Sequence, residues 1–256
     1  MKFDPIRKIK ELIDAYDDTH NFTCDLCGCE VFAGERVCAD CMKTLPLNNG
    51  AICPFCGRKV GEAGACLDCK EKPLGAERAR SVCTHEGKAA ETVLRFKRGA
   101  RYFCRTFAYL ALPVLQREFA DADLLTYVPM TKKAFKKRGY NQAGLLCAQL
   151  ARLSGKPMGE VLVKKKETEQ QKSLGRRERE ENLTGCFGVI EKEAVKGKKI
   201  LLIDDVMTTG ATVGEISAAL KKAGACSVYV LTITSVTRPS PFGKADGKKK
   251  IHPNAP

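Results

Sequence analysis

The sequence predicts an α/β protein in which helices cover a parallel β-sheet, with a small cysteine-rich module in front of it. Two observations support this fold class. Apolar runs alternate with helical patterns over the C-terminal two thirds of the chain, and regularly spaced cysteines fill the segment before them. Alternating strands and helices are typical of a parallel sheet covered by helices. The length of 256 residues suits one ordinary domain and a smaller module.

Apolar runs and helical periodicity locate the expected elements. The strands are expected at 79–84, 124–128, 160–163, 200–204 and 227–236, and the helices at 88–96, 101–118, 140–153 and 213–223. A further amphipathic helix is expected at 5–16. The stretch 164–182 is polar and without apolar periodicity, which predicts a mobile loop inside the domain.

These patterns divide the chain into four parts. We expect an N-terminal helix within 1–20, the cysteine-rich module at 21–72, the α/β domain at 76–238 and a disordered basic tail at 239–256. The longest apolar run falls short of the roughly 18 residues that a membrane helix needs. The first residues are charged rather than signal-like. The sequence therefore predicts a cytoplasmic protein without membrane insertion.

Eight of the 14 cysteines form two copies of the pattern C-x2-C…C-x2-C. They are Cys24, Cys27, Cys38 and Cys41 in the first copy, and Cys53, Cys56, Cys66 and Cys69 in the second. A C-x2-C turn places two thiolates on one edge of a tetrahedron, and the glycines Gly28 and Gly57 let backbone N–H groups curl toward the sulfurs. Because cytoplasmic thiols stay reduced, the spacing predicts two structural zinc ions rather than disulfides.

Two details of the metal sites stay open at this stage. Pairing of the cysteines in sequence order is favoured, but a crossed arrangement is an alternative. Cys29 is the one plausible substitute ligand among the remaining cysteines. Four-thiolate sites leave no open coordination position, so these zinc ions are not expected to be catalytic.

A phosphate-binding segment is predicted at 200–212. Its apolar strand ends in Asp204 and Asp205, and a helix follows a short loop of small residues. The loop consists of Thr208, Thr209, Gly210, Ala211 and Thr212. Free N–H groups at a helix N-terminus favour a phosphate, and carboxylates at the carboxyl end of a parallel strand can bind ribose hydroxyls. A ribose 5-phosphate fits both halves. The lysine of a P-loop is missing.

The string IDDVMTTGAT resembles the signature for phosphoribosyl pyrophosphate (PRPP) in type I phosphoribosyltransferases. Three further strings resemble the ComF competence family: VPMTKKAFKKRGYNQA at 128–143, the polar segment 171–182, and RFKRG at 95–99. The resemblance spans Cys24 to about Thr237. It implies a type I phosphoribosyltransferase fold, a parallel sheet flanked by helices, with a small double zinc ribbon at its N-terminus.

The resemblance also implies roles for individual residues. It assigns the ribose to Asp204 and Asp205, the 5-phosphate to 208–212, the pyrophosphate to Lys132, Lys133 and Arg138, and loop closure to Gln171, Arg179 and Asn182. Lys97 is a further PRPP-binding candidate, with Arg95 as its alternative. For each lysine of 132–137, a solvated surface position is an equal alternative.

Two functions follow as hypotheses. The first is a transferase that moves the phosphoribosyl group from PRPP, carried with Mg²⁺, to an unknown acceptor and is associated with DNA uptake. The second is a non-catalytic competence protein that binds single-stranded DNA, works with competence-machinery proteins and keeps the PRPP site as a sensor. The formal charge of +14 suits either polyanion. Aromatic residues beside basic ones at 101–103 and 138–140 could stack bases, although such aromatics are more often core.

Overall fold

The computed structural model describes residues 21–166 and 184–237. Several expectations therefore lie outside the described residues. These are the helix at 5–16, the loop candidates Gln171, Arg179 and Asn182, and the tail at 239–256. No helix in the described part of the chain is long and apolar enough to cross a lipid bilayer.

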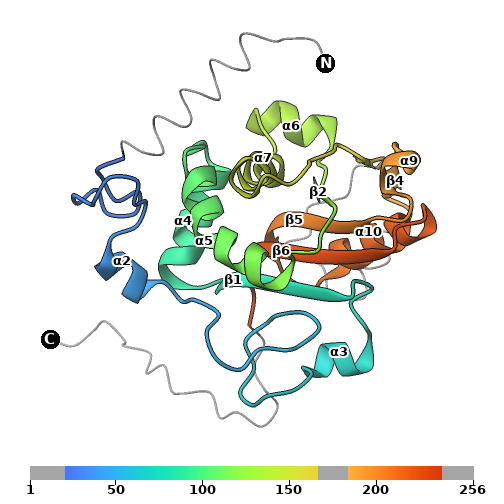
Figure 1. Cartoon of the computed structure of the whole chain (residues 1–256), viewed down its shortest axis with the longest axis horizontal. Coiled ribbons are helices and arrows are strands. Elements are labelled where there is room, and N and C mark those ends of the chain that lie inside the picture. The colour runs from blue at the N-terminus through green and yellow to red at the C-terminus, as the bar shows by residue number, and fades with distance from the viewer. Residues whose placement is uncertain (1–20, 167–183, 238–256) are drawn as a thin grey trace, which may run out of the picture.

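A four-stranded parallel sheet forms the centre of the molecule, as predicted (Figure 1). Its strand order is β1-β6-β5-β2. The strands are β1 (Arg78–Thr84), β6 (Ser227–Ser235), β5 (Lys199–Met207) and β2 (Leu124–Tyr127). The strand expected at 160–163 is not part of this sheet. It forms β3 (Leu162–Lys164), which pairs antiparallel with β4 (Phe187–Val189), a strand that the sequence analysis missed.

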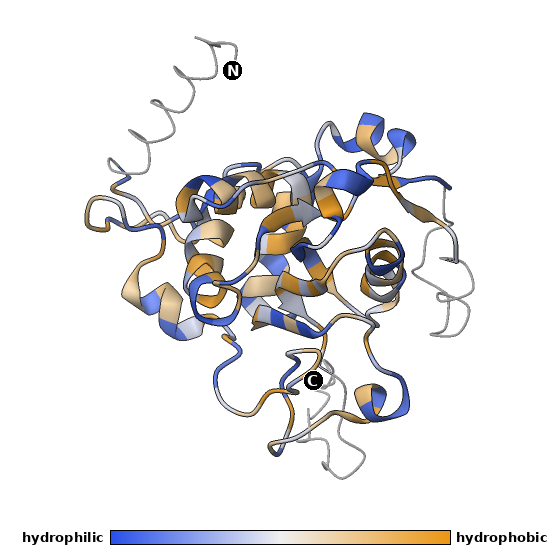
Figure 2. Ribbon diagram, turned by 45° about the vertical axis from the view of Figure 1, so that its right-hand side comes forward, coloured by the Kyte–Doolittle hydropathy of each residue, from blue (hydrophilic) through white to orange (hydrophobic). Residues whose placement is uncertain are grey.

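Helices cover both faces of this sheet, which explains its continuous apolar strands. One face carries α4 (Gly87–Lys97), α5 (Phe103–Glu118) and α7 (Gln142–Ser154), and the other carries α10 (Ala211–Lys222) with β3 and β4 (Figure 1). Leu201 and Ile203 face the first group, whereas Ile200 and Leu202 face α10. All four side chains are fully buried. The apolar faces of the helices turn toward this core (Figure 2).

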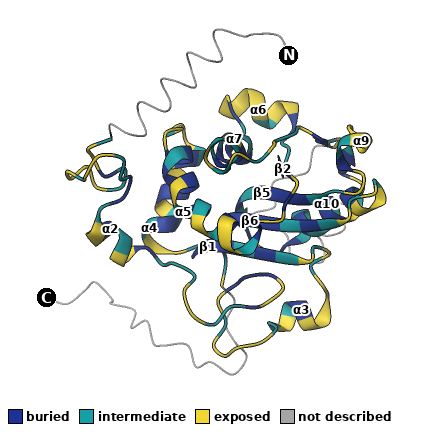
Figure 3. Ribbon diagram, in the orientation of Figure 1, coloured by how far each residue is buried: buried dark blue, intermediate teal, exposed yellow. Residues whose placement is uncertain are grey.

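Two sequence expectations about the elements were incomplete. The strand predicted at 200–204 continues to Met207, so Asp204 and Asp205 lie inside β5 rather than after it. The aspartates interrupt the apolar run, so the sequence does not indicate this extension. Backbone pairing with β6 continues the strand as far as the pair Met207 and Ser235. The short helices α6 (Lys132–Arg138) and α9 (Lys192–Val195) were also missed. Helix α6 buries none of its residues (Figure 3). Because no face of the helix packs on the core, its sequence lacks the apolar periodicity that predicts a helix.

The cysteine-rich module lies along the outer edge of β1. Its connecting segment pairs with the strand, since Leu47 bridges Cys83 and Asn48 N–H donates to Val82 O at 2.9 Å. Ala79 N–H donates to Phe55 O at 2.7 Å. Two short helices, α2 (Ala39–Thr44) and α3 (Leu67–Glu71), complete the module. The module thereby covers an edge strand that would otherwise present unpaired backbone groups.

The two ribbons pack on opposite faces of the sheet. Ribbon 1, residues 21–45, joins the apolar core formed by α4, α5 and α7. Ribbon 2, residues 51–72, joins the core formed by α10, β3 and β4. Only ribbon 2 therefore shares its core with the helix that follows the predicted phosphate loop.

Candidate functional site

The carboxyl ends of the four parallel strands meet at one edge of the sheet. There β5 passes Asp204 and Asp205 and leads through Thr208 and Thr209 into α10. Open parallel sheets bind ligands at this edge because loops and helix N-termini gather there. The structure thus brings the predicted ribose-binding and phosphate-binding residues to the same place.

The two aspartates point to opposite faces of the sheet, as successive residues of a strand do. Asp205 is 9% exposed, and its Oδ1 lies 3.1 Å from Lys97 Nζ. Asp204 Oδ1 accepts a hydrogen bond of 2.8 Å from Asp205 N–H. Burial, and then the nearby charge of Asp205, raise the pKa of Asp204 to about 7. Near pH 7 the Asp204 carboxyl is therefore only partly ionised.

Lys97 is the last residue of α4 and reaches the site, whereas its alternative Arg95 turns away. The Arg95 guanidinium lies over the Phe103 ring at 4.8 Å and donates to Tyr102 Oη at 2.9 Å. Lys97 instead forms the ion pair with Asp205. Of the two candidates, the structure places Lys97 beside Asp205.

The loop after β5 presents a helix N-terminus to the same edge. Gly210 is the N-cap of α10 with φ +86°, and a Cβ there would lie 2.6 Å from Leu74 Cδ1. Thr209 Oγ1 accepts from Ala211 N–H at 3.3 Å. The first turn of this 12-residue helix contains no acidic residue, so its N–H groups and dipole favour an anion.

Sequence reasoning missed His85, which follows β1 directly at this edge. Its Nδ1 lies 2.8 Å from Thr234 Oγ1, and its N–H donates to Ser235 O at 2.8 Å. Burial and the charge of Lys97 lower the pKa of His85 against the opposing effect of Asp205. The imidazole is therefore neutral near pH 7. Its position just after an apolar strand was the signal that could have identified it.

The basic helix α6 begins shortly after the end of β2. All four of its lysines are exposed, and none forms an ion pair with another residue that the structure describes: Lys132, Lys133, Lys136 and Lys137. Arg138 Nη1 donates to Gln142 Oε1 at 2.8 Å. Phe135, a residue that sequence reasoning passed over, is 49% exposed among these lysines. The helix therefore presents a basic surface with one aromatic ring.

The other aromatic candidates for base stacking are largely core. Phe103 is fully buried and Tyr140 is 5% exposed, which confirms the core interpretation for both. Tyr102 is 46% exposed, but its ring packs against Phe103 with centroids 4.4 Å apart. Phe135 is thus a better stacking candidate than any of the three.

The structure gathers the cysteines of each ribbon in sequence order. The thiols of Cys53, Cys56, Cys66 and Cys69 lie within 4.8 Å of one another, as do those of Cys24, Cys27, Cys29 and Cys38. In the first group Cys29, the alternative ligand, thus stands where the spacing predicted Cys41. Cys41 lies next to the group, since its N–H donates to Cys38 Sγ at 3.3 Å and its sulfur accepts from Lys88 Nζ at 3.3 Å. Backbone N–H groups point at the sulfurs, for example Cys66 N–H to Cys53 Sγ at 3.4 Å. Both groups fit structural zinc, for which four thiolates are a common ligand set.

The first cluster has five thiols for four coordination positions, which makes a test of the ligand set possible. We expect the purified protein to contain two zinc ions per chain, and Cys29→Ser to retain both. Cys41→Ser should lose one, because the C-x2-C pairs supply the ligands. Metal analysis of the reduced proteins measures this. Loss of a zinc from Cys29→Ser, with two retained by Cys41→Ser, would overturn this ligand assignment.

Comparisons with known proteins agree with this architecture. Residues 21–70 match the double zinc ribbon domain family, and residues 134–252 match the phosphoribosyl transferase domain family. The chain is 32% identical to competence protein ComFC of Bacillus subtilis over 78% of this chain and 84% of that protein. It is 30% identical to competence protein F of Haemophilus influenzae (82% and 95%) and 29% identical to DNA utilization protein YhgH of Escherichia coli (81% and 94%).

Proposed function

The chain belongs to the ComF competence family, and from this membership and the site geometry we propose that it binds PRPP and transfers its phosphoribosyl group to an acceptor during DNA uptake. One observation carries the proposal. The two aspartates, the Lys97 ammonium and the N-terminus of α10 lie at the same carboxyl edge of the sheet. PRPP has hydroxyls, a pyrophosphate and a 5-phosphate that match these groups.

In this proposal each group takes one part of PRPP. The N–H groups and hydroxyls of 208–212 bind the 5-phosphate, and the carboxylates of Asp204 and Asp205 accept hydrogen bonds from the 2- and 3-hydroxyls. Lys97 and the start of α6 supply positive charge near the pyrophosphate. Mg²⁺ arrives with PRPP as part of the substrate and neutralises charge on the pyrophosphate oxygens.

The chemistry requires positioning rather than a protein nucleophile. The acceptor forms a bond to C1 of the ribose while the C1–O bond to pyrophosphate breaks, and the bonding electrons leave with pyrophosphate. The transition state resembles an oxocarbenium ion. Fixed dipoles and cations that stabilise the leaving group, together with an aligned acceptor, supply the rate enhancement.

We expect Asp205→Asn to weaken PRPP binding about tenfold or more. The change removes a carboxylate from the ribose site and the ion pair with Lys97, and a hydrogen bond to a charged group is worth about 1.5–3 kcal/mol. Thr209→Val should act similarly through the phosphate. Calorimetric titration with Mg²⁺ and PRPP measures the affinity.

A matched control lies at the opposite edge of the sheet, where Asp121 Oδ2 pairs with Lys199 Nζ at 2.9 Å. Asp121→Asn removes a similar ion pair and should leave PRPP affinity unchanged. If Asp205→Asn and Thr209→Val both fold and bind PRPP as tightly as the wild type, the site is wrongly placed.

The basic surface of α6 favours a second candidate function. It suits a protein that binds single-stranded DNA without catalysis and uses PRPP as a signal. Pyrophosphate release from PRPP and Mg²⁺, measured with a panel of bases and amines, separates the two. Release that depends on an acceptor supports the transferase. PRPP binding without release by any acceptor, together with DNA binding, supports the sensor.

A further inference from the structure

Arg58 connects the second cysteine cluster to the phosphate-binding loop. It lies two residues after Cys56 and its side chain is 4% exposed. Nη1 donates to Asp68 Oδ2 at 2.8 Å, and Nη2 donates to the backbone oxygen of Thr208. Asp68 itself lies between Cys66 and Cys69. The Arg58 guanidinium therefore joins the segments that carry the two cysteine pairs of ribbon 2 and contacts a residue 150 positions away in the chain.

The contact with Thr208 has a defined consequence for the loop. In a planar trans peptide the C=O and the following N–H point in opposite directions. A donor that fixes the Thr208 oxygen therefore turns the Thr209 N–H to the side away from Arg58. That N–H belongs to the segment 208–212, which we assign to the 5-phosphate. Arg58 can thus orient a phosphate donor without touching the phosphate.

Burial makes this orientation depend on ribbon 2. A buried guanidinium is costly unless its N–H groups are paired, and Arg58 Nε has no partner in the part of the chain that the structure describes. The side chain therefore relies on its contacts with Asp68 and Thr208. Opening of the cysteine cluster is therefore expected to displace Asp68 and release Arg58 from this position.

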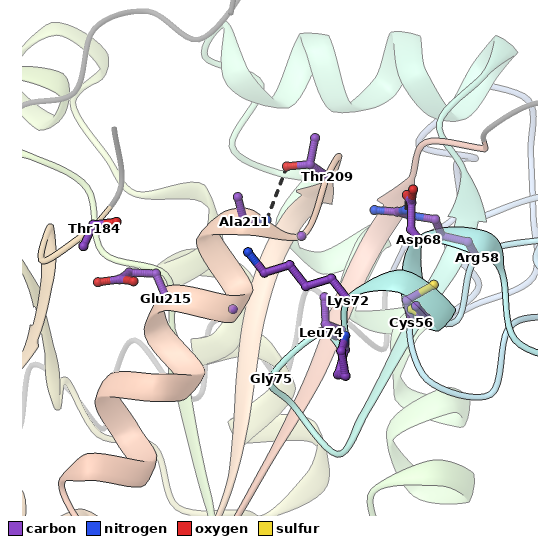
Figure 4. Close-up of a pocket in the computed structure, with 14 residues that line it drawn as sticks. Cys56, Arg58, Asp68, Lys72, Leu74, Gly75, Thr184, Thr209, Ala211 and Glu215 are labelled. Atoms are coloured by element: carbon purple, nitrogen blue, oxygen red, sulfur yellow. Dashed lines mark hydrogen bonds and ion pairs between the residues drawn. The ribbon is translucent and has the colours of Figure 1, made fainter. Parts of the chain in front are cut away.

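A pocket of about 480 Å³ lies between part of ribbon 2 and the loop that leads into α10. Figure 4 shows Arg58 and Asp68 side by side at one end of this pocket, with Lys72 extending along it. Thr209 and Ala211 line the pocket from the loop. Arg58 thus contacts both ribbon 2, through Asp68, and the loop, through Thr208.

We propose that Arg58 is a positioning residue for the PRPP loop, and that PRPP affinity therefore depends on an intact second cysteine cluster. The inference rests on the proposed PRPP site. Ribbon 1 provides the contrast, because its buried Arg36 lies 3.9 Å from Asp25, and Asp25 accepts from Thr106 of α5 at 2.7 Å. That arginine belongs to the ribbon on the other face of the sheet.

The test uses the full zinc-loaded chain with Arg58→Ala, Arg58→Lys and the matched control Arg36→Ala. Arg58→Ala should weaken PRPP binding about tenfold, the size expected for losing a charge-assisted hydrogen bond. Arg58→Lys should recover part of the affinity, and Arg36→Ala should change it less than twofold. Hydrogen–deuterium exchange without PRPP should be faster at 208–214 in Arg58→Ala and unchanged there in Arg36→Ala.

A second measurement needs no variant. Coupling of binding free energies between two sites is reciprocal, so PRPP should raise the chelator concentration that removes half of the zinc from ribbon 2 at equilibrium and leave that for ribbon 1 unchanged. This measurement on the wild type tests the proposal even if Arg58→Ala does not retain the zinc ion of ribbon 2. Equal protection of both zinc ions, or of neither, would count against the coupling.

The outcomes separate this inference from the proposed function. If the zinc-loaded wild type binds PRPP and Arg58→Ala binds it equally well with unchanged exchange, the positioning role is wrong and the PRPP site stands. Equal weakening by Arg36→Ala would show general destabilisation and would also overturn it. If the wild type does not bind PRPP, the proposed function fails, and the exchange measurement alone shows whether Arg58 orders the loop.

Discussion

Cys53→Ser should remove one zinc ion per chain and unfold ribbon 2, while the parallel sheet stays folded. Structural zinc contributes about 10–16 kcal/mol of binding free energy in zinc-finger peptides, and most of it appears as folding free energy. Ribbon 2 has little else to hold it together, because its buried apolar positions are mainly the ligands Cys53, Cys56 and Cys69. The sheet has its own core on β5 and β6 and does not depend on the metal.

Metal analysis and limited proteolysis check this expectation together. The variant should contain one zinc and should be cleaved between 51 and 72 under conditions in which the wild type is intact. Cys226→Ser is the matched control, because Cys226 is an exposed cysteine outside both clusters. Two zinc ions in Cys53→Ser, with unchanged protease resistance, would show that the second group of thiols is not a metal site.

Lowering the pH should remove the zinc ion and unfold ribbon 2, as Cys53→Ser does, because zinc binds thiolates and displaces their protons. In the metal-free ribbon, burial raises the pKa of the Cys56 thiol to about 12. Zinc must therefore remove a proton that this thiol holds strongly. As the pH falls, protons compete better for the sulfurs and occupancy decreases, so ribbon 2 should become protease-sensitive at a higher pH when a chelator is present.

The sequence was most informative where spacing alone defines chemistry. The cysteine pairs and the string from Asp204 to Thr212 indicated both sites, because their geometry depends on neighbours in the chain. The apolar runs located the four parallel strands, because a strand buried on both faces is apolar along most of its length. These local patterns need no knowledge of the tertiary arrangement.

Features that depend on distant contacts could not be predicted. Lys97 and Arg95 are two positions apart on α4 and so lie on nearly opposite sides of it, and only the placement of α4 on the sheet decides which one reaches Asp205. The Arg58 contact with Thr208 joins residues 150 positions apart. The position of His85 after an apolar strand marks it as a candidate, but its contact with Thr234 depends on the pairing of β1 with β6, which no local pattern specifies.

Replacing the four lysines of α6 by glutamine should lower single-stranded DNA affinity about a hundredfold or more near 0.1 M salt. Each phosphate contact with a single strand contributes about 0.7 to the slope of log affinity against log salt, so four contacts contribute roughly 3. The variant should therefore bind weakly and with a much shallower salt dependence. Because α6 buries none of its residues, the substitutions should leave the fold intact.

The matched control carries the same change of charge at the other edge of the sheet. Lys192, Lys196, Lys198 and Lys222 lie near the amino ends of β5 and β6, and their replacement by glutamine should have little effect on DNA binding. Phe135→Ala tests stacking separately, since one base–aromatic contact is worth about 1–3 kcal/mol. An equal loss of DNA affinity in both lysine variants would show that binding depends on the net charge of the protein rather than on α6.

PRPP should compete partly with DNA for this surface. Helix α6 begins at the edge where we place the pyrophosphate, so the two polyanions would need the same cationic groups. Fluorescence anisotropy with Mg²⁺, with and without saturating PRPP, measures the competition. If the ribbons carry the DNA contacts instead, PRPP should leave DNA affinity unchanged, and the α6 variant should bind as the wild type does. Absence of DNA binding by the zinc-loaded protein at low salt would remove the nucleic-acid function and leave the transferase.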